Sequence, residues 1–261
     1  MKFPSVFTLF ILFALIGLNS ACGLLPADEA TSPPGAPVHT LVFLDKSVSV
    51  DVNKVFVQEK YRLALNDIVE RNMANKGDRL EIYFIHENTA KAKALSLAVH
   101  SEKEAIENAN ATDREASETA FQMSLQREKG IFLRQAMAKL NQLNTGASNQ
   151  ATDIWASMPI IAKAAEDGAQ VRVYYFSDMI ESVKGSDRRD FHRQPPTDNA
   201  QAESWAKADA KKMAQYVLGT PEITVVSPFE PTASTKENNP HVSRYWQVLF
   251  EELGGVGLEE M

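Results

Sequence analysis

The sequence predicts an α/β domain built around a mostly parallel sheet, and two observations support this fold class. Short runs of β-branched and aromatic residues alternate with longer segments of helical periodicity, which is the pattern of βα units. Hydrophobic residues make up 44% and charged residues 23% of the 261 residues, close to the globular average, so a wholly disordered chain and a multispan membrane protein are excluded. We expect one globular domain over residues 39–261.

The N-terminus has the pattern of a secretory signal. Lys2 precedes an apolar run over residues 3–18, which is shorter than the roughly 20 residues of a spanning helix. The small residues Ser20 and Ala21 follow, immediately before Cys22. We therefore expect residues 1–21 to be a signal peptide that is not part of the fold.

The segment that ends at Cys22, LNSAC, resembles the lipobox of bacterial lipoproteins. The resemblance implies that Cys22 is lipidated and anchors the protein in the bacterial cell envelope. Gly23 stands where an aspartate commonly retains such proteins at the inner membrane, which favours the outer membrane. The alternative is ordinary cleavage, giving a periplasmic or secreted protein with a free thiol. Residues 22–38 contain four prolines and are expected to form a semi-extended tether.

Beyond the tether, strands and helices are predicted from hydrophobic periodicity. The helices are expected to end where glycine follows, as at Gly77 and Gly254. The expected strands are residues 39–45, 79–86, 93–100, 171–178 and 222–228, and the expected helices are residues 53–75, 203–218 and 241–253.

Residues 101–143 form a long polar stretch that is unusual for such a fold. Two capping-box patterns, Ser101 with Glu104 and Thr112 with Glu115, predict two helices within it. We expect a helical insertion that packs on the sheet and extends outward. A partner-binding or coiled-coil arm is the alternative.

Oxygen-bearing side chains follow the first predicted strand at alternate positions, Asp45, Ser47 and Ser49. Thr152, before a predicted helix, and Asp178, at the end of a later strand, should face the same crevice, because ligands bind at the carboxyl ends of parallel strands. Hydroxyl and carboxylate oxygens without cysteine favour Mg²⁺ or Mn²⁺. So few protein ligands would leave a coordination position open for an outside oxygen.

These five residues resemble, in order, the metal ion-dependent adhesion site of the von Willebrand factor type A domain, whose motif is Asp-x-Ser-x-Ser, then Thr, then Asp. The resemblance covers residues 39–255. It implies a three-layer α/β/α sandwich, direct metal ligation by the serines, and a partner carboxylate that completes the coordination shell. The family often has glycine after the last aspartate, where this chain has Met179, a side chain large enough to crowd the site.

Other interpretations of these residues remain open. Turn formation alone would explain Asp45, Ser47 and Ser49. Catalysis by either serine needs a histidine partner, and the five histidines have no spacing that nominates one, although His86 is the nearest in topology. A net charge of −7 disfavours nucleic acid. We therefore expect a binding module and not an enzyme.

One basic loop stands out in this acidic protein. Residues 182–202 contain Arg188, Arg189 and Arg193, which we predict to dock an acidic partner segment, since guanidinium groups pair bidentately with carboxylates. The predicted function is a membrane-tethered, divalent-cation-dependent module that binds a carboxylate on a protein partner. The alternatives are a scaffold subunit of an envelope assembly with a degenerate metal site and, third, a metal-dependent hydrolase.

Overall fold

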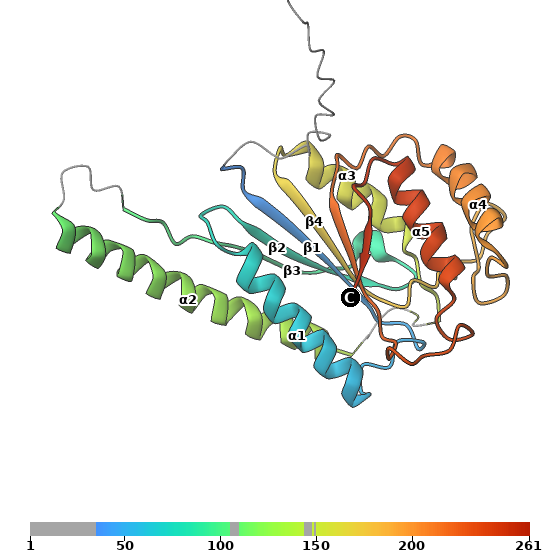
Figure 1. Ribbon diagram of the computed structural model, residues 1–261, viewed down its shortest axis with the longest axis horizontal. Helices are drawn as coiled ribbons and strands as arrows, with labels where there is room; N and C mark the ends of the chain where they lie inside the picture. The colour runs from blue at the N-terminus through green and yellow to red at the C-terminus, as the bar shows by residue number, and fades with distance from the viewer. Residues whose placement is uncertain (1–34, 105–109, 144–147, 149) are drawn as a thin grey trace, which may run out of the picture. The chain divides into compact units, whose positions relative to one another are not determined.

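A six-stranded sheet forms the centre of the computed structural model, with the strand order β3-β2-β1-β4-β5-β6 (Figure 1). All neighbouring strands are parallel except β2 and β3, which are antiparallel. The mostly parallel sheet is therefore confirmed. The strands are β1 (Val38–Asp45), β2 (Arg79–Ile85), β3 (Lys93–Ala98), β4 (Gln170–Phe176), β5 (Glu222–Val226) and β6 (Leu258–Glu260).

The structure describes residues 35–104, 110–143, 148 and 150–261. The predicted signal peptide, Cys22 and most of the predicted tether lie outside the described residues. In the part that is described, no helix combines the length and the apolar character needed to cross a membrane.

Helices cover both faces of the sheet, which confirms the three-layer α/β architecture (Figure 1). One face packs against α1 and α2, and the opposite face packs against α3, α4 and α5. The helices are α1 (Val55–Asn72), α2 (Ala111–Asn141), α3 (Met158–Glu166), α4 (Asn199–Lys212) and α5 (Pro240–Glu252), with short 3₁₀ turns at Thr89–Lys91 and Trp155–Ser157.

Strand β1 contributes side chains to the hydrophobic core on both faces of the sheet. Val42 and Leu44 pack with α1 and α2, whereas Leu41 and Phe43 pack with the helices on the other face. Successive side chains of a strand point to opposite faces, so a central strand with helices on both sides must be apolar throughout. This explains the unbroken apolar run that predicted the strand.

The segment after β3 differs from its prediction. Residues 101–104 are not helical, so a helix capped by Ser101 and Glu104 is wrong there. The Ser101 hydroxyl is instead hydrogen-bonded to that of Ser124, 2.8 Å away. A single long helix, α2, begins at Ala111, because the Asn110 side chain accepts a hydrogen bond from Asp113 N (2.9 Å) and caps it.

The register brings the carboxyl ends of β1, β2 and β4 together. Asp45 lies beside Ile85 of β2, and Leu44 lies beside Phe176 of β4. The loops that follow these three strands therefore share one edge of the sheet, where the predicted site residues were expected. Strand β6 was not predicted, and α3 was expected only as a helix beginning somewhere after Thr152.

Candidate metal site

Asp45 is the last residue of β1, and hydrogen bonds fix its carboxylate on both sides. The side chain is only 2% exposed. One carboxylate oxygen accepts the backbone N–H of Ser47 (2.8 Å), and the other accepts the Ser177 hydroxyl from the loop after β4 (2.6 Å). Asp45 thus ties its own loop to the neighbouring strand end.

The two serines and Asp178 continue this cluster. The hydroxyls of Ser47 and Ser49 are hydrogen-bonded to each other at 2.9 Å. Asp178, one residue beyond Ser177, accepts Ile180 N at 3.1 Å, and its carboxylate lines the same cavity as Ser49. The structure therefore brings four of the five predicted ligands to one place, and hydrogen bonds join Asp45, Ser47 and Ser49.

Thr152 reaches the same edge through a loop that is anchored on either side of β1. The N–H of Asp153 donates to the carbonyl of His86, just after β2 (3.3 Å). The N–H of Thr152 donates to the hydroxyl of Ser182, and the N–H of Ser182 donates back to the carbonyl of Thr152 (2.9 and 3.0 Å). The loop is thus held between the ends of β2 and β4.

The hydroxyl of Thr152 is buried and has no hydrogen-bond partner among the described residues. The residue is 1% exposed. A buried hydroxyl without a partner costs about 1–3 kcal/mol, so it calls for an explanation. A cation bound at this edge of the sheet would supply one.

Two buried carboxylates at one place create an electrostatic cost. Burial raises the pKa of Asp45 to about 7, and the nearby charge of Asp178 adds to the rise, although hydrogen bonds from Ser177 and Ser47 oppose it. Burial also raises the pKa of Asp178. Neither carboxylate forms an ion pair within the described part of the chain.

The adjacent lysine does not neutralise Asp45 by direct contact. The ammonium group of Lys46 donates to the carbonyls of Lys139 (3.1 Å) and Leu140 (2.6 Å) at the end of α2. Burial lowers the pKa of Lys46 to about 8. Lys46 thus stabilises the C-terminal end of α2, where a cation is favourable, and does not pair with Asp45.

The donor set fits a hard divalent cation. Its members are two carboxylates and three hydroxyls, all of them oxygen ligands of the kind Mg²⁺ prefers. Across the described ranges, no group of three or more His, Cys, Asp or Glu side chains is arranged to hold a metal ion. A metal at this edge would therefore depend on the hydroxyls of Ser47, Ser49 and Thr152.

Met179 does not crowd the cluster, contrary to the expectation from the sequence. Its side chain is 4% exposed and lies in the hydrophobic core on the α5 side of the sheet. Its carbonyl accepts the indole N–H of Trp246 at 2.8 Å. The backbone has a φ of 60°, a conformation that favours glycine, and this turns the side chain into the core.

All three arginines predicted to dock a partner form ion pairs inside the chain, and two of them pair with wholly buried acids. Arg188 pairs with Asp153 and with the wholly buried Glu181 (2.6 Å), and Arg189 pairs with the wholly buried Asp209 (2.6 Å). Only Arg193 has a mostly exposed side chain, at 76%. The structure thus gives Arg188 and Arg189 an internal role, and Arg193 is the arginine that stays accessible.

Sequence reasoning missed Glu181, which organises the Thr152 loop. Its carboxylate accepts the backbone N–H groups of Ile154 (2.8 Å) and Trp155 (3.3 Å). Burial raises its pKa to about 7 even though the charge of Arg188 opposes the rise. No sequence motif marks this residue, because the backbone groups that it holds, Ile154 and Trp155, lie 27 and 26 residues earlier in the chain.

His86, the nearest candidate for a catalytic partner, is engaged in its own loop. The N–H of Asn88 donates to its Nδ1 at 3.0 Å, and burial lowers the pKa of the ring. Within the described residues, no hydrogen bond joins a histidine to Ser47 or Ser49.

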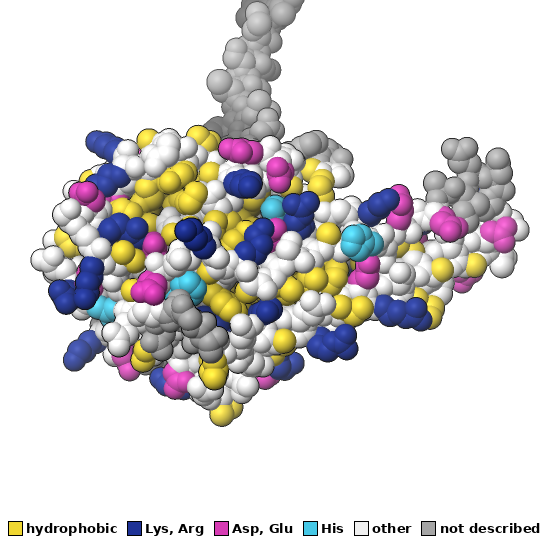
Figure 2. Space-filling view, turned by 180° about the vertical axis from the view of Figure 1, so that it is seen from behind, with side chains coloured by type: hydrophobic (Ala, Val, Ile, Leu, Met, Phe, Trp, Pro, Cys, Tyr) yellow, Lys and Arg dark blue, Asp and Glu magenta, His cyan; other side chains and the backbone are white. Residues whose placement is uncertain are grey.

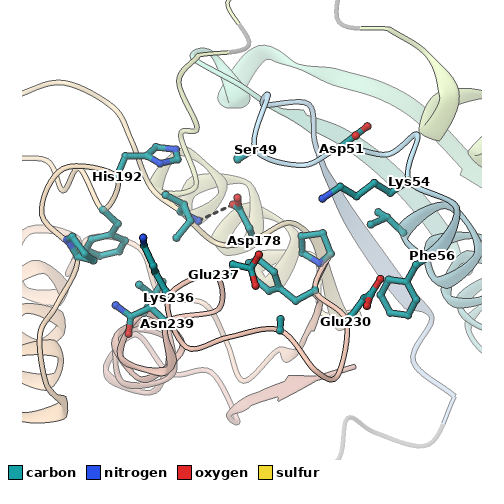
Figure 3. Close-up of a pocket in the computed structure, with 18 of the residues that line it drawn as sticks. Ser49, Asp51, Lys54, Phe56, Asp178, His192, Glu230, Lys236, Glu237 and Asn239 are labelled. Atoms are coloured by element: carbon teal, nitrogen blue, oxygen red, sulfur yellow. Dashed lines mark hydrogen bonds between the residues drawn. The ribbon is translucent and has the colours of Figure 1, made fainter.

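A cavity of about 700 Å³ opens beside the cluster and includes Ser49 and Asp178 in its lining (Figure 3). The rest of the wall comes from the start of α1, the loop before α4 and the loop between β5 and α5. The oxygen cluster therefore faces a space that a ligand could enter.

Comparison with known proteins gives fold-level likeness only. No protein-family model matches the chain, and no curated protein matches its sequence. A von Willebrand factor type A protein from Catenulispora acidiphila is 10% identical, with a TM-score of 0.37 over 87% of this chain and 39% of that chain. The human COPII-coat protein Sec24c is 10% identical, with a TM-score of 0.32 over 87% and 29%.

An adhesive tip pilin, GBS104 from Group B Streptococcus agalactiae, is also 10% identical, with a TM-score of 0.28 over 66% of this chain and 54% of that chain. The chain thus spans less than two thirds of the length of each of these proteins. Likeness at this level assigns no function.

Proposed function

We propose that the chain is a divalent-cation-dependent binding module of the von Willebrand factor type A kind. Asp45, Ser47, Ser49, Thr152 and Asp178 would hold Mg²⁺ or Mn²⁺, and a carboxylate on a protein partner would complete the site. The observation that carries the proposal is the buried, unpartnered hydroxyl of Thr152 at the same sheet edge as the hydrogen-bonded oxygen cluster.

The residues around the proposed site would have separate roles. Asp45 orients the loop by accepting Ser47 N, and Ser177 fixes the carboxylate from β4. Ser47 and Ser49 present hydroxyl oxygens, while Glu181 and Ser182 hold the backbone around Thr152. A bound divalent cation would supply the positive charge that attracts a partner's carboxylate and offsets the charges of Asp45 and Asp178.

The most direct experiment compares two threonines. Thr40 in β1 is also buried with an unpartnered hydroxyl, but it lies within the strand and not at its carboxyl end. Replacing either by valine removes an unsatisfied hydroxyl, so Thr40→Val and Thr152→Val should each stabilise the metal-free protein by about 1 kcal/mol. Thermal unfolding with and without Mg²⁺ measures both effects.

The response to Mg²⁺ then distinguishes the two positions. Wild type and Thr40→Val should both gain melting temperature with millimolar Mg²⁺, whereas Thr152→Val should lose most of this gain, because ligands that bind only the folded state stabilise it. An equal response in all three proteins would overturn the metal site. Absence of any response in wild type would do so as well.

We propose that binding, and not catalysis, is the function of this edge. The hydroxyls of Ser47 and Ser49 are hydrogen-bonded to each other, and the Nδ1 of His86 accepts a hydrogen bond within its own loop. A hydrolase would need a general base within reach of a nucleophile. Within the described residues, no histidine is hydrogen-bonded to either serine, and the carboxylates beside them, Asp45 and Asp178, are assigned to the proposed metal site.

We further propose that a lipid on Cys22 tethers the domain at the bacterial cell envelope, with the outer membrane favoured over the inner. Each buried methylene of an acyl chain stabilises membrane residence by about 0.8 kcal/mol. Cys22→Ser should therefore move the protein from the membrane fraction to the soluble fraction. Recovery of this variant in membranes after a high-salt wash would contradict the anchor.

A scaffold role through α2 is the second candidate. The residues of α2 that are buried begin only at Leu125, so its first half contacts little of the domain. Figure 2 shows side chains of both charges on this part of the helix, and Met123 is an exposed apolar residue among them. A partner bound there would be retained in chelator, which separates this candidate from the metal-dependent module.

A further inference from the structure

Tyr61 of α1 is buried beside the oxygen cluster, although it belongs to none of the predicted ligands. The residue is 1% exposed. Its ring packs edge to face on that of Phe176, with the ring centroids 4.9 Å apart. Phe176 is the last residue of β4 and directly precedes Ser177, whose hydroxyl donates to Asp45. Tyr61 therefore lies next to the strand end that leads into Ser177 and Asp178.

The hydroxyl of Tyr61 has no hydrogen-bond partner among the described residues. The fully or mostly buried tyrosines elsewhere do have one: Tyr83 with Glu81, Tyr174 with Asn72, Tyr175 with Ser157 and Tyr245 with Asp209. A buried hydroxyl that gives up water without a new partner destabilises the fold. Tyr61 thus has a hydrogen-bonding capacity that the described part of the chain does not use.

The two carboxylates of the cluster act on this phenol. Burial raises the pKa of Tyr61 well above its usual value, and the charges of Asp45 and Asp178 raise it further. Because the interaction between charges weakens with distance, both carboxylates lie near the ring. The phenol stays protonated at neutral pH, so it can donate and accept hydrogen bonds but is not an anionic ligand.

Tyr61 and Thr152 approach this edge from opposite faces of the sheet. Tyr61 belongs to the core under α1, whereas the loop of Thr152 continues into Ile154 and Trp155 of the core on the α3 side. Each has a buried hydroxyl without a partner among the described residues. Since Mg²⁺ keeps several of its waters in proteins, a hydrated cation between them would give both hydroxyls a partner.

We propose that the Tyr61 hydroxyl is a positioning group of the proposed cation site, where it accepts a hydrogen bond from a water molecule that the cation retains. This inference rests on the proposed function and adds to the site a residue of α1 that lies outside the five predicted ligands. A neutral hydroxyl suits this role, because it holds the water without adding a third negative charge to Asp45 and Asp178. Water held by a divalent cation is in turn a strong donor.

The test compares two tyrosines in the full-length protein. Tyr61→Phe removes an unpartnered hydroxyl, whereas Tyr175→Phe removes one that is equally buried but bonded to Ser157 at 2.6 Å. In chelator, the melting temperature should be maintained or raised in Tyr61→Phe and lowered in Tyr175→Phe. In calorimetric titrations with Mg²⁺, binding should be about fivefold weaker in Tyr61→Phe, the equivalent of one hydrogen bond, and unchanged in Tyr175→Phe.

A spectroscopic measurement separates this role from packing. In protein labelled with carbon-13 at the tyrosine Cζ, each signal reports on the bonding of one hydroxyl, and the signal that is missing from Tyr61→Phe belongs to Tyr61. Added Mg²⁺ should shift this signal in wild type and in Tyr175→Phe. A ring that only fills space in the core would not give this shift.

The outcomes distinguish this inference from the proposed function. Equal Mg²⁺ affinity in wild type and Tyr61→Phe, with the Tyr61 signal unmoved, would overturn the role of Tyr61 and retain the metal site. A melting temperature in chelator that falls as far in Tyr61→Phe as in Tyr175→Phe would also overturn the role, because the hydroxyl would then have a partner without the cation. Absence of Mg²⁺ binding in wild type would overturn the metal site and, with it, this inference.

Discussion

Two pairs of buried carboxylates in this protein differ in how their negative charge is balanced. Glu181 and Asp209 are wholly buried, and each is paired with an arginine of the loop before α4. Asp45 and Asp178 are nearly as buried but have no cationic partner within the described residues. The chain supplies its own cation to Glu181 and Asp209, whereas Asp45 and Asp178 are the pair for which we propose a cation from outside.

The largest effect is expected when the internal cation beside Glu181 is removed. Arg188→Ala leaves Glu181 buried and unpaired, so we expect a loss of about 3–5 kcal/mol in the free energy of unfolding. Urea denaturation measures it. Arg193→Ala is the matched control, because its side chain is 76% exposed and its ion pair with Asp190 should be worth less than about 1 kcal/mol.

A second variant tests whether the arginine is needed only because of the acid. Arg188→Met combined with Glu181→Gln removes both charges and keeps most of the volume. This double variant should recover much of the stability lost in Arg188→Ala. Equal destabilisation of both variants would show that packing of Arg188 on the Trp155 ring, 4.8 Å from its centroid, and not charge, holds the loop.

The second prediction concerns pH in the absence of metal. Because the pKa of Asp45 in the folded state is raised to about 7, its contribution to stability is greatest below its unfolded pKa of about 4 and is lost as the pH rises towards 7. In chelator, unfolding free energy should therefore fall across this window, by on the order of 1–3 kcal/mol from this residue.

Asp45→Asn and added Mg²⁺ separate the contribution of Asp45 to the pH dependence from that of Glu181. Glu181 also has a raised pKa, so part of the fall persists in Asp45→Asn and only the difference from wild type reports Asp45. Mg²⁺ should flatten the profile of wild type, since the cation favours the ionised carboxylates, and should leave that of Asp45→Asn almost unchanged. Identical profiles for the two proteins in chelator would contradict the assignment of the raised pKa to Asp45.

The smallest effect is expected at Lys46. Lys46→Met should cost about 1 kcal/mol, because two carbonyls at the end of α2 lose their donor. The rise in melting temperature with Mg²⁺ should survive, since the ammonium group contacts α2 and not Asp45. If Mg²⁺ binding weakened tenfold or more in this variant, the loop geometry of Asp45 would depend on α2.

The features that could be predicted are those that depend on short stretches of sequence. The unbroken apolar run of β1 reflects burial on both faces, and the oxygens that follow it mark the carboxyl edge of the sheet. The ion pair of Glu181 with Arg188 could not be predicted, because both lie in an irregular loop whose conformation depends on hydrogen bonds to residues 152–155. Arg188 and Arg189 were predicted to lie on the surface because the loop is rich in basic residues. In the structure they pair instead with the buried Glu181 and Asp209.

Local signals also failed where tertiary partners compete for the same groups. Ser101 has the spacing of a helix cap, but its N–H donates to Glu128 and its hydroxyl bonds to Ser124, so the chain stays extended. Strand β6 is three residues long, and only its pairing with β5 defines it. An element this short shows no hydrophobic periodicity in the sequence.

Helix α2 extends well beyond the part of it that packs on the domain. Its 31 residues form a rod about 46 Å long, of which only the second half is clamped to the domain. The clamped end finishes at the two carbonyls held by Lys46, the residue next to Asp45. The end of α2 and the loop of candidate metal ligands are thus joined by one side chain, so a partner that displaced this helix end would act first on the residue between Asp45 and Ser47.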